Sequence, residues 1–360
     1  MSYRRIGDYI ELVDKRNKDL SITKLLGLSI SKQFIPSVAN TIGTNMKNYK
    51  IIRKNQFACS VMQVRRDGKM PVALLKEFDE AIISQAYPVF QVIDETELLP
   101  DYLMMWFTRS EFDRQATFHA VGGVRGSLEW EDFLDFELPI PSIVKQQQIV
   151  AEYNTVTNRI QLNEKINTNL EATAQALYKH WFVDFGSAET LIGEILTPNK
   201  GRNITREKAI HGIYPVIAGG INPSCYHNDF NTNKPVVTIS ASGANAGYIN
   251  LHETKVWSGD SSFIDRSTYE SIYFIYCALK VNEKLLMSKQ TGTGQPHIYP
   301  EQISTIPINN YTEEKAILFN KKVKPLFLKI YINKEQSETL RELQSLLLAK
   351  MTKVEEIEMI

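Results

Sequence analysis

Apolar residues recur in alternating steps of four and three along two stretches of the chain, one starting at Ile149 and the other at Phe319. The first stretch has the columns Ile149, Val156, Asn163, Leu170, Leu177 and Tyr153, Ile160, Asn167, Ala174, Trp181. The second has Phe319, Leu326, Asn333, Leu340, Leu347 and Val323, Ile330, Ser337, Gln344, Met351. Columns seven residues apart predict two long helices that pair as a coiled coil.

The middle of each seam is polar, at Asn163 and at Asn333. A buried asparagine fixes the register of a coiled coil at some cost in stability, so both residues are predicted to set the register. The spacing alone fits parallel and antiparallel pairing, but a two-fold arrangement of the two halves favours antiparallel helices. The alternative is two core helices of one large domain, which seldom keep so narrow a seam.

The ends of both helices are marked. Pro139 and Pro141 stop the segment before the first helix, and Ser142 with Gln146 resembles a helix start. A helix over residues 142–185 would have 44 residues and a length of about 66 Å. Thr312, followed by two glutamates, marks the start of the second helix. Pro325 is expected to kink that helix or to shift its start.

The segments outside the two long helices are predicted to form domains that contain both strands and helices. Residues 87–92 and 235–239 are β-type runs, and residues 100–115 and 268–289 each predict one helix. The predicted fold class is therefore α+β: two α/β domains separated by two long helices that form an antiparallel coiled coil.

The chain also repeats itself. Residues 6–10 are echoed by 192–196, residues 122–126 by 292–296, and residues 138–141 by 306–309. Because the echoes keep the same order and each copy runs into a long helix, the organisation is domain, helix, domain, helix.

The helical motifs resemble those of a known family. Pro141-Ser142-Ile143-Val144-Lys145-Gln146-Gln147-Gln148-Ile149-Val150, Leu162-Asn163-Glu164-Lys165-Ile166-Asn167 and Leu177-Tyr178-Lys179-His180-Trp181-Phe182-Val183-Asp184-Phe185 are similar to the central conserved region of type I restriction-modification specificity subunits. The second helix departs from this phrase at residues 347–351. The resemblance implies target recognition domain 1 at 1–141, a central conserved helix at 142–185, target recognition domain 2 at 186–310 and a C-terminal conserved helix at 311–360.

The resemblance also implies what the chain does. Each recognition domain would read one half of a split double-stranded DNA target. The coiled coil would set the spacing and dock two methyltransferase subunits, restriction subunits would join the full complex, and this chain would have no catalytic site. No cofactor is implied for this chain, since S-adenosylmethionine would sit on the partner.

Composition fits a soluble protein and limits its partners. The chain has 360 residues, 41 Lys and Arg against 41 Asp and Glu, and 43% hydrophobic residues. Neither a membrane span nor a secretory signal is evident, and three scattered cysteines fit a reducing compartment, so the cytoplasm is expected. Zero net charge argues against nonspecific coating of nucleic acid.

Charge is nevertheless segregated along the first domain. Residues 47–76 hold eight basic residues and one acid, whereas residues 77–101 hold seven acids and no Lys or Arg. The predicted phosphate face comprises Lys47, Lys50, Arg53, Lys54, Arg65, Arg66, Lys69 and Lys76. Residues 65–69 look like a basic hairpin tip, and Gln63 is a candidate reader of adenine. The alternative is a solvated surface with intermixed charges.

Two polar loops are the candidates in the second domain. Ser240, Ser242 and Asn245 lie in a small-residue loop, and Lys289, Gln290 and Gln295 lie in a glycine-rich loop that matches residues 119–127 with Arg125. Backbone amides and hydroxyls of such loops commonly contact phosphates. The alternative is plain hairpin connections. Because the two domains offer different residue types, the predicted target is asymmetric.

Enzyme motifs are missing from the sequence. It has no Asn/Asp-Pro-Pro-aromatic motif for a flipped adenine, no phosphate-binding loop and no histidine spacing typical of a metal site. Glu-x-Lys triplets at 253–255 and 313–315 are too common to indicate a nuclease. Trp181 and Phe182 are predicted as exposed aromatic contacts for a partner. The competing hypotheses are a coiled-coil protein-interaction scaffold without DNA readout and a cryptic nuclease or methyltransferase.

Overall fold

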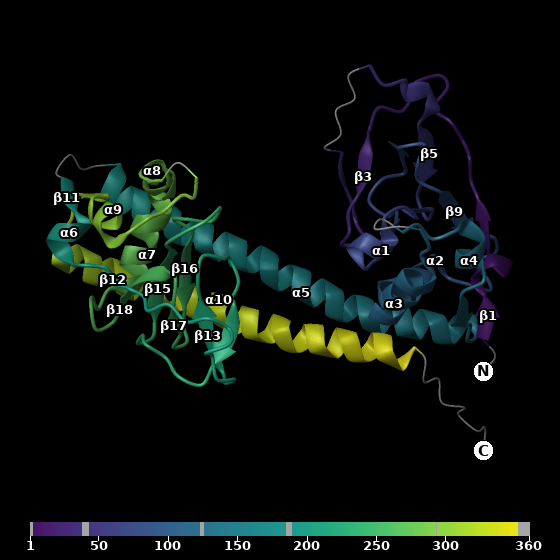
Figure 1. The fold of residues 1–360 in the computed structure, drawn as a ribbon. Helices are drawn as coiled ribbons and strands as arrows, with labels where there is room; N and C mark the ends of the chain where they lie inside the picture. Colours follow the sequence, from purple (N-terminus) through teal and green to yellow (C-terminus); the bar gives the residue numbers. More distant parts are fainter. Residues whose placement is uncertain (1–2, 38–42, 123–125, 185–188, 293, 352–360) are drawn as a thin grey trace. The chain divides into compact units, whose positions relative to one another are not determined.

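The structure is a computed structural model that describes residues 3–37, 43–122, 126–184, 189–292 and 294–351 (Figure 1). The chain forms two compact units. Unit 1 comprises Met1–Ile160 and Thr339–Ile360, and unit 2 comprises Gln161–Glu338. Each unit therefore contains one mixed domain and one part of each long helix.

Unit 1 is built from short strands and helices around an aromatic core. Its elements are β1 (Tyr3–Arg5), η1 (Ile6–Asp8), β2 (Ile10–Leu12), β3 (Leu26–Leu28), β4 (Phe34–Pro36), η2 (Met46–Asn48), β5 (Lys50–Arg53), β6 (Phe57–Cys59), α1 (Val64–Asp67), β7 (Val72–Leu74), β8 (Glu80–Ile83), β9 (Val89–Val92), α2 (Pro100–Thr108), α3 (Ser110–His119), α4 (Trp130–Leu134) and β10 (Glu137–Pro139). An antiparallel sheet has the order β2-β9-β6-β7, and β1–β10, β3–β4 and β5–β8 are two-stranded. Phe57, Phe90, Phe107 and Phe133 pack together in the core.

Unit 2 has the same mixed character. Its elements are β11 (Glu189–Leu191), α6 (Ile192–Ile195), β12 (Asn199–Lys200), β13 (Tyr214–Ile217), β14 (Cys225–His227), β15 (Val236–Ser240), β16 (Ile249–His252), β17 (Trp257–Ser258), β18 (Ser261–Asp265), α7 (Ile272–Val281), α8 (Glu283–Ser288), α9 (Pro300–Ser304) and β19 (Pro307–Asn309). Its sheets have the orders β12-β18-β15-β16, β14-β13-β17 and β11-β19. The core joins α7 to residues of both long helices, among them Tyr178 and Phe319.

The internal repeat is visible in three dimensions within each unit. The first strand pairs antiparallel with the last, β1 with β10 and β11 with β19. After the first strand, a helical turn packs against a short helix, η1 against α4 in unit 1 and α6 against α9 in unit 2. A glycine lies at each contact: a Cβ at Gly7 would lie 3.0 Å from Leu134 Cβ, and one at Gly193 would lie 2.9 Å from Ser304 Cβ. Glycine is therefore needed at both positions for close packing.

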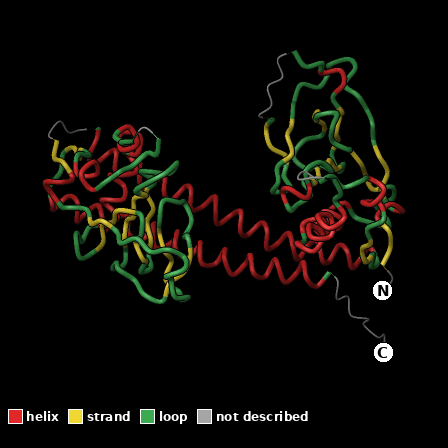
Figure 2. Tube along the Cα trace, viewed as in Figure 1, coloured by secondary structure: helices red, strands yellow, loops and turns green. Residues whose placement is uncertain are grey.

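The two long helices are present as predicted (Figure 2), and their contacts show that they run antiparallel. They are α5 (Ile143–Tyr178), which continues as a π-helical turn over Lys179–Val183, and α10 (Glu313–Lys350). In unit 1, Gln344 Nε2 donates to Thr157 Oγ1 at 2.8 Å. In unit 2, Asn333 Nδ2 donates to Asn167 Oδ1 at 2.9 Å. Higher residue numbers in α5 therefore pair with lower residue numbers in α10, so the helices are antiparallel, as predicted. The predicted α+β class with a coiled coil is also confirmed.

The polar layer of the seam lies inside unit 2. Asn163 and Asn333 are each 1% exposed. The Asn163 amide donates to Gln336 Oε1 at 3.0 Å and to Ser337 Oγ at 3.2 Å, while its Oδ1 is buried without a hydrogen-bond partner in the described part of the chain. Such an arrangement costs stability but favours one alignment of the helices.

Replacing Asn163 by leucine is therefore expected to raise the free energy of unfolding by about 1 kcal/mol, because the desolvated oxygen is removed, while the register loosens. Chemical denaturation measures the first effect. A disulfide between cysteines introduced at Thr157 and Gln344 measures the second, since its yield should fall in the Asn163→Leu background. An unchanged yield would show that the asparagine does not set the register.

Two local expectations were wrong, and one alternative for Pro325 is not observed. The helix predicted over 100–115 is broken at Arg109, whose backbone is extended with φ −68° and ψ 144°. The helix predicted over 268–289 begins at Ile272 and is interrupted at Asn282. Pro325 does not shift the start of α10, which begins at Glu313 and continues past the proline; Pro325 is on the exposed side of the helix, while neighbouring Val323 and Phe327 are buried.

Candidate nucleic-acid interface

In unit 1, two loops are held side by side. The first connects the antiparallel strands β6 and β7 over residues 60–71, and the second spans residues 121–127. Leu128 N donates to Val61 O at 2.9 Å, and Arg65 N donates to Gly126 O at 3.3 Å. A Cβ at Gly126 would come within 2.5 Å of Arg65 Cβ, so the close approach requires glycine. Arg125 lies outside the described residues.

The first loop carries a basic helical turn. The predicted hairpin tip is instead α1, which follows Gln63 and precedes Gly68, both in the left-handed region with φ 65° and φ 62°. The segment does join two antiparallel strands, but through a longer connection than a tight turn. Arg65, Arg66 and Lys69 are exposed. Arg66 donates through Nε and Nη2 to the Asp67 carboxylate at 2.7 and 3.1 Å, so Arg65 and Lys69 are better placed to meet a ligand.

Unit 2 holds the equivalent pair of loops. Residues 241–247 lie against residues 291–298. Ile298 N donates to Ala241 O at 2.9 Å and Gly243 N donates to Pro296 O at 3.0 Å, which matches the two contacts between the loops of unit 1. Both second loops are also closed by a β-bridge, Val121 with Ser127 and Thr291 with His297.

The unit 2 candidates occupy different positions in this pair. Gln295 is exposed, whereas Asn245 and Lys289 are half-buried. Gln290 is exposed, but its Nε2 donates to Ala246 O at 2.8 Å and so joins the two loops. Ser242 Oγ donates to Asp260, and Ser240 is 3% exposed inside β15. We therefore leave Ser240 out of the proposed interface.

The other basic residues of unit 1 lie outside these two loops. Lys47, Arg53 and Lys54 are exposed near β5. Strand β5 pairs with β8, which places Arg53 opposite Glu80 with 3.8 Å between Nε and Oε2. The basic and the acidic run of the sequence thus meet in the fold at Arg53 and Glu80.

Two further lysines of the predicted phosphate face are occupied. Lys50 Nζ donates to Tyr87 O at 2.9 Å, and its side chain is 12% exposed. Burial lowers the pKa of Lys50, although Asp14 opposes the effect. Lys76 Nζ pairs with Asp101 Oδ2 at 2.7 Å. We leave Lys50 out of the proposed interface, because its ammonium group faces the protein.

A buried ion pair, which no sequence motif indicates, supports the basic loop. Asp113 in α3 accepts Met70 N at 3.1 Å and lies 2.8 Å from Lys32 Nζ. Burial lowers the pKa of Lys32, while Asp113 favours the charged form. Met70 is fully buried directly after Lys69, so this pair anchors the end of the loop that carries Lys69. Lys32 and Asp113 are far apart in sequence and follow no motif.

The aromatic end of α5 differs from the expectation. Phe182 is 0% exposed and packs against Phe274 and Phe319 in the core of unit 2, so the prediction that it is exposed was wrong. The π-helical turn that starts at Lys179 places it inward. Trp181 is half-buried with its ring centre 5.9 Å from that of Phe319. Of these two described residues, Trp181 is therefore the one that keeps some exposed surface.

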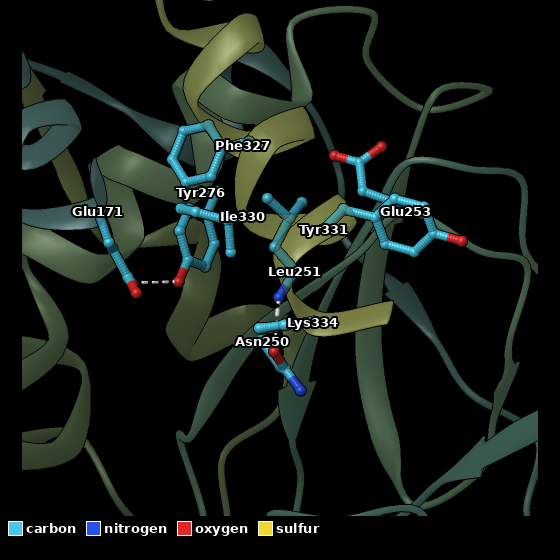
Figure 3. Close-up of a pocket in the computed structure, with 9 residues that line it drawn as sticks. All are labelled: Glu171, Asn250, Leu251, Glu253, Tyr276, Phe327, Ile330, Tyr331 and Lys334. Carbon is cyan, nitrogen blue, oxygen red and sulfur yellow. Dashed lines mark hydrogen bonds between the residues drawn. The ribbon is translucent and has the colours of Figure 1, made fainter. Parts of the chain in front are cut away.

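Unit 2 also contains a small pocket of about 50 Å³ beside α10. Figure 3 shows that Tyr276 donates a hydrogen bond to Glu171 on one side of the pocket. Glu253 lies on the other side of the pocket. Glu253 Oε1 is buried without a hydrogen-bond partner among the described residues, and burial raises the pKa of Glu253. This volume is close to that of one or two water molecules, so the pocket is too small for a nucleotide.

The raised pKa of Glu253 predicts a pH dependence of stability. The folded state binds the proton more tightly than the unfolded state, so stability is lost as the pH rises from the ordinary value of 4.5 through the raised folded value. Glu253→Gln removes this loss. The melting temperature of the variant relative to the parent should therefore increase from pH 4 to pH 8. Glu207→Gln, at an exposed position, is the control, and a pH-independent difference for Glu253→Gln would contradict the prediction.

The described residues contain no group of three or more His, Cys, Asp or Glu side chains arranged to hold a metal ion. Among the same residues, no helix combines the length and apolar character needed to cross a bilayer.

Similarity to known proteins agrees with the two-part organisation. The sequence model of the family described as type I restriction modification DNA specificity domain matches residues 4–172 and 188–347. A putative type I specificity subunit of Mycoplasma genitalium, S.MgeORF438P, is 24% identical over 197 residues, which cover 50% of this chain and 51% of that protein. The MjaIX specificity subunit of Methanocaldococcus jannaschii is 23% identical over 301 residues, which cover 72% of this chain and 70% of that protein. The chain thus spans about half the length of the first relative.

The fold has a solved counterpart. The crystal structure of the S subunit of a type I restriction-modification system from M. genitalium superposes with a TM-score of 0.63 at 18% identity and covers 97% of this chain and 95% of that one. The relatives are named for the specificity subunit and not for the subunits that methylate or cut. The family match extends over most of the chain, once in each repeat, and confirms the resemblance of its motifs: the chain belongs to the type I restriction-modification DNA specificity family.

Proposed function

We propose that this chain is the non-catalytic specificity subunit of a type I restriction-modification complex and that each unit reads one half of a bipartite, asymmetric DNA target. The observation that carries the proposal is the pair of loops built with the same backbone contacts in both units. Equivalent scaffolds with different side chains suit two readers of different sequences.

Unit 1 offers guanidinium and ammonium groups to its half-site. Arg65 can pair with the O6 and N7 atoms of guanine in the major groove, and Lys69 can neutralise a phosphate. Arg66, Lys47, Arg53, Lys54, Gln63 and Arg125 remain candidates for weaker or backbone contacts. Unit 2 offers mainly neutral groups, with Ser242, Asn245, Gln290 and Gln295 beside Lys289, which favours adenine edges and backbone contacts.

The recognition domains are assigned to 1–141 and 186–310, and the conserved helices to 142–185 and 311–360. In this proposal α5 and α10 set the distance between half-sites and dock two methyltransferase subunits, with Trp181 as a contact. Restriction subunits complete the complex in the cytoplasm. Asn163 and Asn333 keep the helices in register and thereby the spacing fixed.

The test is to express the chain with its methyltransferase subunit and to map methylated adenines in host DNA with and without this gene. A split recognition sequence that disappears with the gene supports the proposal. Exchanging residues 60–71 and 121–127 for those of another specificity subunit should change one half of that sequence only. If a complex assembles but shows no sequence preference in methylation or gel-shift assays, the chain is a scaffold instead.

A further inference from the structure

Val121 is an apolar side chain on the surface of the loop pair of unit 1, which comprises residues 60–71 and 121–127, and it is 58% exposed. The residues that anchor its loop are buried: Ala120 is 2% exposed, Leu128 is 1% exposed, and both belong to the core of unit 1. Val121 therefore adds little to the core, and its side chain is accessible to a ligand.

The backbone holds Val121 in a defined position. Val121 N donates to Ser127 O at 3.0 Å, Ser127 N donates to Val121 O at 2.9 Å, and Gly126 N donates to Gly122 O at 3.0 Å. Gly122 and Gly126 have φ angles of 88° and 36°, which only glycine adopts readily, and they close the loop tightly. A β-branched side chain has few rotamers, so the methyl groups of Val121 lose little freedom when they meet a ligand.

The equivalent position of unit 2 holds Thr291, which is also exposed. Thr291 N donates to His297 O at 3.0 Å and His297 N donates to Thr291 O at 2.8 Å, so the same backbone bridge closes both loops. Threonine has the shape of valine with a hydroxyl in place of one methyl group. A position with the same backbone and a different side-chain chemistry in each unit suits a residue that distinguishes two half-sites.

The charges beside Val121 indicate the class of ligand. The segment 60–71 is hydrogen-bonded to the loop of Val121 and carries the exposed side chains of Arg65 and Lys69. The one acid in the sequence of this segment, Asp67, is already paired with a neighbouring arginine. An excess of exposed cations favours a polyanion such as DNA.

Two further apolar side chains are exposed in the same region. Met62 lies in the segment 60–71 and is 46% exposed, and Phe118 lies in the last turn of α3, which packs against α1, and is 85% exposed. In its major groove, DNA offers apolar side chains the 5-methyl group of thymine, whereas base edges in the minor groove present only hydrogen-bonding groups. Apolar residues among these cations therefore point to thymine.

We propose that Val121 is a specificity-determining residue that contacts the 5-methyl group of a thymine in the half-site read by unit 1. Met62 and Phe118 exclude water from this contact, and Thr291 presents a hydroxyl from the same position to the other half-site. The inference rests on the proposed function, because it assigns a base contact to the loop pair of unit 1.

The test removes the methyl group from the DNA alone. The target identified by methylation mapping is synthesised with each thymine in turn replaced by deoxyuridine, which keeps base pairing, and the affinity of the complex with the methyltransferase subunit is measured by titration. Burial of one methyl group changes affinity about fourfold. At least one thymine should show this loss in the half-site that changes when residues 60–71 and 121–127 are exchanged.

Val121→Ala tests the protein side of the same contact. This variant should bind the thymine target about fourfold more weakly and should no longer distinguish thymine from deoxyuridine at that position, since the two changes remove the two partners of one contact. Val121→Thr keeps the β-branched shape and should weaken the distinction. Ile93→Ala is the matched control, because Ile93 is 56% exposed in unit 1 but lies outside both loops; it should keep the distinction in full.

The outcomes separate this inference from the proposed function. Weaker binding by Val121→Ala with an unchanged ratio between thymine and deoxyuridine would mean a packing role or an apolar wedge, and would overturn the methyl contact. The contact is also overturned if no thymine in that half-site responds to loss of its methyl group. Sequence-specific binding would remain in both cases and leave the specificity-subunit proposal standing, whereas a parent complex without sequence preference would defeat both.

Discussion

Replacing Arg65 by alanine is expected to lower the affinity of the complex for its target by about 5- to 150-fold and to relax the base preference in one half-site only. The magnitude corresponds to the 1–3 kcal/mol of a bidentate contact between arginine and guanine. Arg65 is exposed on α1 and has its backbone fixed by Gly126, so the guanidinium is presented from a defined position.

Two further variants test whether Arg65 acts by recognising a base or only by its charge and packing. Arg65→Lys keeps the charge and most of the stem that contacts Gly126 but loses the planar fork, so it should retain nonspecific binding and still lose the base preference. Arg5→Ala is the matched control, because Arg5 is exposed in unit 1 but pairs with Asp135 and is not a candidate for DNA contact.

Binding is measured by titration against targets with single substitutions in each half-site, at two or more salt concentrations. Lys69→Ala should weaken binding to all sequences alike and reduce the salt slope by about one. Equal loss of preference in both half-sites on Arg65→Ala would contradict the assignment of unit 1 to one half.

The long helices were predictable because their signal is periodic. Ten positions in each seam follow a seven-residue spacing, and both asparagines meant to interrupt it lie in the buried layer of unit 2. The direction of pairing needed an argument from symmetry, since the asparagines match in either direction. The π-helical turn after Tyr178 was not foreseeable, because it leaves the apolar pattern unchanged while turning Phe182 inward.

The loop pairs of the candidate interface were predictable only at the positions that belong to the internal repeat. The echo of residues 122–126 in 292–296 marked the second loop of each unit, and a run of small residues marked the loop at 241–247. Contacts between distant residues were not predictable: the pairing of β5 with β8 places Arg53 opposite Glu80, and Lys32 meets Asp113. Such pairings depend on the tertiary fold and leave no local pattern.

The break in the helix at Arg109 was also not predictable from local sequence. Residues 100–115 contain no proline or glycine after Pro100, so propensity predicts one continuous helix. The observed chain leaves the helical region at Arg109, and its guanidinium stacks on Trp106. Local rules of propensity therefore do not predict this break.

Adding four residues to each long helix, after Asn167 in α5 and before Asn333 in α10, is expected to lengthen the gap between half-sites by one or two base pairs without changing their sequences. Four helical residues add about 6 Å, and one base pair occupies about 3.4 Å. Both helices must be lengthened, because the Asn333 amide donates to Asn167 across the pair and an insertion in one alone would break the seam.

Four residues suit this test better than seven. Four residues are 1.1 helical turns, so the seam is displaced by about 40° and the coiled coil absorbs this as a local unwinding. The displacement has the same sense as the rotation of the right-handed DNA over the added base pairs, whereas a seven-residue insertion leaves the seam in place while the DNA turns by about 100°. Methylation mapping measures the gap. Four residues inserted after Arg206, in an exposed loop of unit 2, should leave it unchanged, and an unaltered gap in the helix variant would show that α5 and α10 do not set the spacing.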